Sequence, residues 1–203
     1  MSLSPEVLKN TLLFCFKSMT SDTDFSNGIA NACTVYCATA TIDTVDAGVI
    51  SGGSFAGKGS GNGIICSPPL ASTIISAACL LMPTLGDLAD NYLAEQLAIG
   101  LNTMVSAGTI TTNVTGILTP PPPAVPVPTT GTATGSIICN YITLSQGLKD
   151  CFERMKHPPE GVDGDEMFAE ELSNLFTDYL TQGQVITNGQ GNLVGSVGTG
   201  AVS

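Results

Sequence analysis

Apolar residues recur every three to four positions in three separate parts of the chain, which is the spacing of one face of an α-helix. The first part opens at Ser4-Pro5, an N-cap followed by a proline at the first helical position. A polar linker at 20–22 divides it, so the pattern predicts two helices, the second ending near Gly48. Their apolar positions are Leu8, Leu12 and Cys15, and then Phe25, Ile29, Cys33, Cys37 and Val45.

The same order of helices follows twice more along the chain. The second part opens at Ser67-Pro68, and its helices are predicted to end before Gly108. The third part starts near Leu144, and its second helix is predicted to end before Gly183. Counting back from the three glycines aligns Cys33 with Leu93 and Phe168, Cys37 with Leu97 and Leu172, and Val45 with Val105 and Leu180.

An alternating segment rich in glycine, threonine and β-branched residues follows each predicted helix pair. Clear examples are 109–116 and Val185–Thr187, the latter followed by the hairpin-turn pair Asn188-Gly189. The tripeptide Ile-Ile-Cys ends two of these segments, at 64–66 and 137–139. Each part of the chain is therefore predicted to end in a β-hairpin.

The predicted fold class is α+β, built from three tandem helix–helix–β-hairpin repeats at 1–66, 67–139 and 140–203, an order compatible with a pseudo-threefold arrangement. The proline-rich stretch 119–128 is predicted to form an exposed, extended tip on the second hairpin. Because an isolated hairpin is marginally stable, we expect the hairpins to pair with one another or to extend a partner's sheet.

Charge and hydropathy narrow the possible partners. The chain holds 17 acidic and six basic residues, a net charge of −11, which argues against nucleic-acid binding. A mean hydropathy of +0.31 instead favours association with itself or with other proteins. The stretch Leu70–Met82 is shorter than the roughly 20 residues that span a bilayer, so we expect no membrane partner. The opening residues lack a basic segment, and we expect no secretory signal.

The seven cysteines are odd in number and form no Cys-x-x-Cys pair, which favours small buried residues in a reducing cytosol over a disulfide framework. Cys33 and Cys37 can share one helical face, but a metal site needs further ligands, and the one histidine, His157, is far along the chain. A cysteine-dependent enzyme acting through Cys33 or Cys151 remains an alternative, and it would require a thiol of low pKa.

Four other motifs have simpler structural explanations. The stretch 52–59 approaches a phosphate-binding loop, but Gly59 stands where a serine or threonine is needed. Residues 163–166 begin like a calcium loop whose later ligands are missing, so Asp163 or Asp165 is expected to cap a helix. His157 lies in a polar linker, and Asn113 begins a glycosylation triplet without a secretory context. We expect no catalytic residue, no cofactor site and no metal site.

The Ser-Pro helix start, the Ala-Gly helix ends and the Thr-Gly-rich terminal hairpin resemble small virion proteins of tailed bacteriophages. The matching segments are Met1–Pro5 and 198–202, while the triplication, the cysteines and the proline insertion depart from that pattern. The resemblance implies a non-enzymatic structural protein of the phage tail, baseplate or head–tail region, assembled in the host cytoplasm into the virion. Its partners would be other virion proteins and itself, meeting through β-hairpins and apolar helix faces. The alternatives are a cysteine-dependent enzyme and a membrane-active protein.

Overall fold

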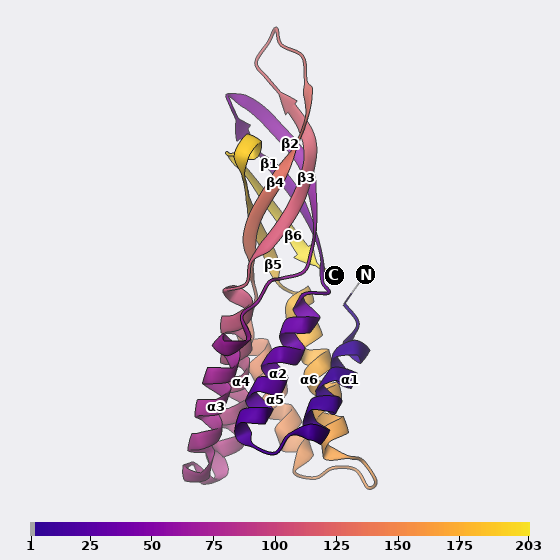
Figure 1. Cartoon of the computed structure of the whole chain (residues 1–203), viewed down its shortest axis with the longest axis vertical. Helices are drawn as coiled ribbons and strands as arrows, with labels where there is room; N and C mark the ends of the chain where they lie inside the picture. Colours follow the sequence, from indigo (N-terminus) through magenta and orange to yellow (C-terminus); the bar gives the residue numbers. More distant parts are fainter. Residues whose placement is uncertain (1–2) are drawn as a thin grey trace.

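The computed structural model describes residues 3–203, which form an elongated molecule with two distinct ends (Figure 1). Helices gather at one end and strands form a barrel at the other. The helices are α1 (Pro5–Ser18), α2 (Asp22–Cys37), α3 (Pro68–Leu81), α4 (Ala89–Ser106), α5 (Tyr141–Met155) and α6 (Gly164–Thr181). The strands are β1 (Thr41–Ile50), β2 (Gly53–Asn62), β3 (Ile110–Thr119), β4 (Val127–Ile138), β5 (Gln184–Gly189) and β6 (Ser196–Val202).

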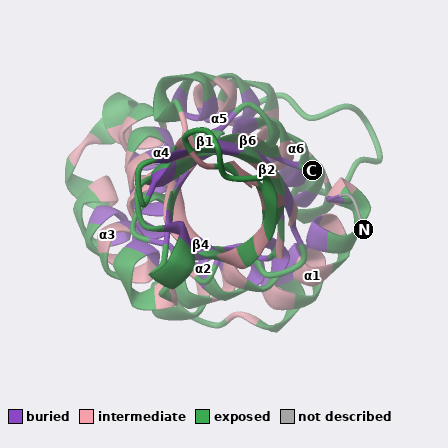
Figure 2. Cartoon of the chain, turned by 90° about the horizontal axis from the view of Figure 1, so that it is seen from above, coloured by how far each residue is buried: buried purple, intermediate pink, exposed green. Residues whose placement is uncertain are grey.

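The six helices form a ring in which each packs against its neighbours in sequence, and α1 closes the ring against α6. Viewed along the long axis, this ring is wider than the barrel and surrounds its outline (Figure 2). Fully buried side chains fill the bundle, and the largest include Leu8, Leu12, Ile29, Ile75, Leu97, Leu101, Met104 and Phe176. The helical spacing of these apolar residues explains why the helices form and which faces they bury.

The six strands close into an antiparallel barrel in the order β1 to β6, with β6 pairing back to β1. The hairpins therefore pair with one another, and closure leaves no unpaired strand edge along the barrel in residues 3–203 to extend a partner's sheet. Ser51 and Gly52 form the two-residue turn between β1 and β2, both with positive φ (48° and 81°), as primed hairpin turns require.

Side chains that point into the barrel form three layers. Nearest the helices lies an apolar layer continuous with the bundle core, made of Ile42, Ile110, Ile137, Val185 and Val202. At the far end a separate apolar cluster contains Ile50, Phe55, Val114, Ala133 and Leu193. Between the two lie buried polar residues, Thr44, Asp46, Thr112 and Thr187. Buried side chains therefore line the barrel along its length, and its middle layer is polar.

The predicted boundary in the first part of the chain is wrong. Helix α2 ends at Cys37, Gly48 lies within β1, and Val45 is 64% exposed on the outer face of that strand. The residues after Cys37 are rich in β-branched side chains, and their apolar positions follow the period of two of a strand and not the spacing of a helix. The alignment of Cys33, Cys37 and Val45 with residues of the later helices is wrong for the same reason.

The second helix of each pair, α2, α4 or α6, ends with the same backbone hydrogen bond. The amide of Thr39 donates to the Tyr36 carbonyl, as Gly108 does to Val105 and Gly183 to Leu180. Neither glycine has a positive φ, so left-handed geometry does not explain them. A Cβ on Gly108 would lie 2.7 Å from Ile64 Cγ2, and one on Gly183 would overlap Cys139 Sγ. Close packing requires glycine at these two positions.

Two predicted turns also differ from the structure. Asn188 and Gly189 belong to β5, and the connection to β6 instead contains a short 3-10 helix, Gly191–Leu193. The proline-rich tip spans 120–126, because β4 already begins at Val127, and it reaches furthest from the helices (Figure 1). It is folded rather than extended, since the Ala124 amide donates to the Pro121 carbonyl over 3.3 Å.

Candidate functional site

Four of the seven cysteines lie near the junction between the bundle and the barrel, around Tyr179. The Cys37 thiol donates a hydrogen bond to Cys66, which lowers the pKa of Cys66 and raises that of Cys37 well above its usual range. Burial raises the pKa of Cys139 to about 11. Burial raises the pKa of Cys33 further. In this group only Cys66 is shifted towards the reactive thiolate.

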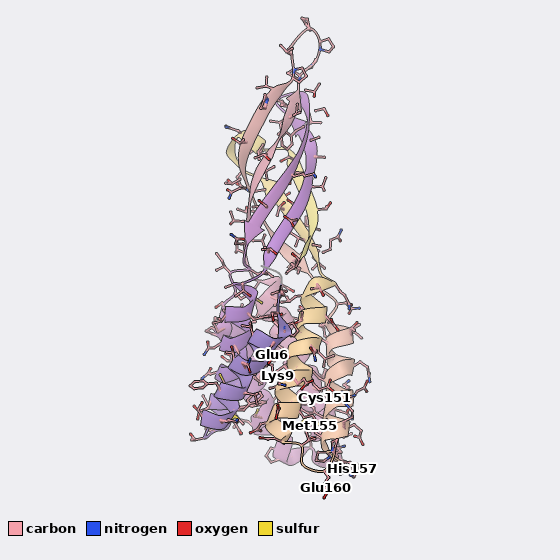
Figure 3. All side chains as sticks on the ribbon, turned by 90° about the vertical axis from the view of Figure 1, so that its right-hand side faces the viewer. Glu6, Lys9, Cys151, Met155, His157 and Glu160 are labelled. Atoms are coloured by element: carbon pink, nitrogen blue, oxygen red, sulfur yellow. The ribbon has the colours of Figure 1, made fainter. Side chains whose placement is uncertain are left out.

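The two cysteines named as candidate nucleophiles are placed far apart in the bundle core. Cys33 lies on α2, and Cys151 lies on α5, where its thiol contacts the Met155 sulfur at 3.8 Å (Figure 3). Burial, with a smaller contribution from Glu171, raises the pKa of Cys151 to about 11. Both thiols therefore keep their protons at neutral pH, which opposes nucleophilic chemistry.

The other sequence motifs serve the local fold. The stretch 52–59 forms the β1–β2 turn and half of β2, with no helix after it to bind phosphate. Asp163 caps α6 by accepting a hydrogen bond from the Asp165 amide at 3.0 Å. His157 is exposed in the α5–α6 connection at the base of the bundle (Figure 3).

Surface ion pairs join helices α1 and α5 to α6. Lys9 on α1 lies 3.0 Å from Glu170 and 3.6 Å from Glu166, both on α6. Arg154 on α5 lies 2.7 Å from Glu171 on α6. These glutamates line a surface hollow beside the α5–α6 connection, and each already faces a cation. The pairs are exposed, so they contribute little stability and no evident chemistry.

Residues 3–203 can also be searched for metal sites and for membrane-spanning helices. They contain no group of three or more His, Cys, Asp or Glu side chains arranged to hold a metal ion. No helix in this range has both the length and the apolar character needed to cross a membrane.

Charge is divided sharply between the two ends of the molecule. Among the 17 acidic residues only Asp43 and Asp46 lie on described strands, and among the six basic residues only Lys58 does. Asp46 points into the barrel, so the outer face of the strands in residues 3–203 carries one acidic and one basic side chain. The helical end is strongly acidic, whereas the barrel presents an almost uncharged surface rich in threonine, valine and glycine.

Exposed apolar residues form a row across this uncharged surface. The strand register places Val197 beside Ala47, Ala47 beside Ala56, Ala56 beside Ile117, and Ile117 beside Pro128. The row crosses five strands, and Ile117 and Val197 are both about half exposed. We call these five residues the barrel row. Contiguous exposed apolar residues of this kind mark interaction surfaces.

The polar layer inside the barrel is the second unusual feature. Thr44 donates a hydrogen bond to Asp46 Oδ2 at 2.8 Å. Asp46 Oδ1, Thr112 Oγ1 and Thr187 Oγ1 are all buried, and within residues 3–203 none has a hydrogen-bond partner. A Cβ placed on Gly59 would lie 2.9 Å from Asp46 Oδ2 and 3.1 Å from Thr112 Oγ1.

No expectation from the sequence includes this polar layer. Its signal is a threonine and an aspartate two positions apart on β1, between strands whose inward positions are glycines. Interpreting that pattern requires knowing that the strands close into a barrel. Neither a known protein family, nor a curated protein, nor a solved structure matches the chain.

Proposed function

We propose that this chain is a non-enzymatic structural protein that assembles with copies of itself and with other proteins of a phage particle. The observation that carries the proposal is the barrel row on an almost uncharged barrel surface. Such a surface is poorly solvated compared with the acidic helical end, and covering it with a partner removes apolar area from water. A particle component needs permanent contacts of this kind, and an uncharged face does not repel its own copies.

The closed barrel restricts how those contacts form. Because all six strands are paired, association uses outward side chains and not the addition of a strand to an open edge. The barrel row supplies apolar side chains from β6, β1, β2, β3 and β4. The acidic helical end then faces away from this contact, which gives the chain a defined orientation in the assembly.

We also propose that the chain contains three helix–helix–hairpin repeats related by a pseudo-threefold axis along the barrel. The order of two helices and two strands occurs three times. The second helices end with the same carbonyl hydrogen bond, and the first inward residues of β1, β3 and β5 correspond. These are Ile42, Ile110 and Val185, each followed two positions later by Thr44, Thr112 or Thr187. One chain would then hold three similar units around one axis, in place of three separate copies of a single unit.

Placement in the tail, baseplate or head–tail region rests on the resemblance of the chain ends to small virion proteins. A pseudo-threefold spike is suited to such regions, whose components are arranged around an axis. Mass spectrometry of gradient-purified particles from the source culture tests this placement. We expect stoichiometric recovery of the chain in the particle band. Recovery only from the soluble lysate would overturn the virion assignment.

A second experiment tests the surface. We expect the purified chain to associate in a concentration-dependent manner in sedimentation velocity, and I117K combined with V197K to abolish that association. The matched control is N113K combined with T199K, which adds the same charge to outward positions of the same strands outside the barrel row. Equal association of both double variants, each folded by circular dichroism, would show that the barrel row is not the contact.

A further inference from the structure

Asp46 is the one charged side chain that is buried among residues 3–203, and its exposed fraction is 0%. It lies at the waist of the barrel, between the apolar layer that joins the bundle core and the apolar cluster around Phe55. A buried carboxylate loses its hydration and must be compensated by hydrogen bonds or by a positive charge. The single hydrogen bond from Thr44 leaves Oδ1 uncompensated.

No basic side chain of the described chain supplies the missing charge. Lys9 and Lys17 belong to α1, Lys149 and Arg154 to α5, and Lys156 to its C-terminal end. The remaining basic residue, Lys58, lies on β2 but is exposed on the outer face of the barrel. The described side chains therefore leave one oxygen of Asp46 without a hydrogen bond and without a positive charge beside it, and a bound cation would supply that charge.

Three buried threonine hydroxyl groups belong to the same polar layer as Asp46, one from each hairpin. Thr44 lies on β1, Thr112 on β3 and Thr187 on β5, and the last two hydroxyl groups have no hydrogen-bond partner in residues 3–203. Five glycines and one alanine stand beside these threonines in the register: Gly59, Gly200, Gly61, Ala133, Gly135 and Gly198. No bulky side chain of a neighbouring strand therefore stands beside these three threonines.

The glycines also bring the oxygens together. The position of a Cβ on Gly198 would overlap both Asp46 Oδ1 and Thr187 Oγ1, and that on Gly59 would overlap Thr44 Oγ1 and approach Thr112 Oγ1. The Thr187 hydroxyl and Asp46 Oδ1 thus flank the same glycine, Gly198, and the Thr112 hydroxyl and Asp46 Oδ2 flank Gly59. An oxygen-only set of this composition suits hard cations and not zinc or copper, which prefer nitrogen and sulfur ligands.

We propose that the barrel waist binds one alkali-metal cation, Na⁺ or K⁺, through the Asp46 carboxylate and the hydroxyl oxygens of Thr44, Thr112 and Thr187. Charge selects the class of ion. The three hydroxyls are neutral, so a monovalent ion exactly balances Asp46, whereas a divalent ion would leave a net positive charge in a site enclosed by two apolar layers. The cation joins the three hairpins at one point, and it therefore stabilises the closed barrel. This inference does not depend on the proposed function.

The test is chemical unfolding of the full chain in NaCl, KCl and choline chloride at equal ionic strength. An ion that binds only the folded state multiplies the folding equilibrium constant about tenfold for each tenfold rise above its dissociation constant. We expect this dependence for Na⁺ or K⁺ and none for choline. D46N should remove it. D43N, which changes an outward carboxyl group on the same strand, should keep it.

Two isosteric variants keep the proposal testable if D46N does not fold. T112V and T187V each remove one ligand without changing side-chain shape, and we expect both to weaken the dependence on the alkali ion. Rubidium-soaked crystals should show an anomalous peak between β1, β3 and β5. Equal stability in sodium, potassium and choline would overturn the proposal. So would a response to micromolar Ca²⁺ in place of alkali ions, or a gain in stability for T112V and T187V with the salt response unchanged.

Discussion

Phe55 provides the sharpest test of how the far end of the barrel is held together. Its side chain is 1% exposed and packs with Ile50, Val114, Ala133 and Leu193, in a cluster separate from the main core. The polar layer lies between this cluster and the helices. Packing around one aromatic ring must therefore stabilise the far end, and Phe55→Ala removes that ring.

The magnitude follows from what surrounds the ring. Truncating a buried phenylalanine to alanine costs about 3–5 kcal/mol, and the larger values occur where neighbours cannot move into the cavity. Here the ring lies against glycine backbone, because a Cβ on Gly57 would be 2.8 Å from Phe55 Cζ and one on Gly116 would be 2.7 Å from Cε2. Backbone held in a closed barrel relaxes little, so we expect a loss of about 4 kcal/mol, a large part of a typical total stability of 5–15 kcal/mol.

The assay is urea unfolding followed by circular dichroism, since the chain has no tryptophan. Phe14→Ala is the matched control, because Phe14 is 76% exposed on α1 and undergoes the same chemical change. We expect it to alter stability by less than about 0.5 kcal/mol. Amide exchange should also accelerate in β2 and β3 of F55A before it does in the helices. A loss below about 1 kcal/mol for F55A, or one no greater than that of F14A, would refute the packing argument.

Three further predictions concern backbone packing and thiols. Gly135→Ala should destabilise the chain by at least about 2 kcal/mol in urea unfolding, because its Cβ would overlap the β5 backbone, while Gly164→Ala, in open space at the start of α6, should be neutral within about 0.5 kcal/mol. Burial raises the pKa of Cys151 to about 11, above an unfolded value near 9, so its contribution to stability is complete below pH 9 and is lost as pH rises. Wild type should lose about 1 kcal/mol more than C151A between pH 8 and pH 10 in the same assay. Under limiting maleimide at pH 8, peptide mass spectrometry should find Cys66 labelled before Cys33, because the pKa of Cys66 is lowered and burial raises that of Cys33. Labelling of Cys33 first would contradict this order of pKa values.

The α+β class and five of the six helices could be located from periodicity, because their buried faces follow a clear 3.6-residue spacing. The end of α2 could not. At the position that Gly108 and Gly183 occupy in the other helix pairs stands Thr39, whose hydroxyl donates to the Tyr36 carbonyl at 2.7 Å. The next glycine along the chain that could end a helix is Gly48, and it lies within a strand.

The closed barrel was harder to predict than its hairpins, because closure depends on pairing between strands far apart in sequence. Gly48, Gly61, Gly135 and Gly200 show why the composition is so rich in glycine: a Cβ at each would overlap the backbone of the next strand. These glycines indicate close approach between strands, but a linear sequence does not reveal which strand approaches. The register that pairs β6 with β1 follows only from the complete fold.

The close approach of the strands also explains which side chains fill the barrel interior. A barrel of only six strands has little internal volume, and its glycines allow a few large side chains to fill it: Phe55 and Leu193 at one end, isoleucine and valine at the other. A waist filled with another apolar layer would be the simplest way to stabilise such a barrel. The chain instead buries Asp46 there with unpartnered threonine hydroxyls, an arrangement that costs free energy unless something compensates it. Retaining a costly polar layer between two apolar ones is the physical reason to look for a ligand at the waist and not in the surface hollows, whose acidic groups are exposed to water.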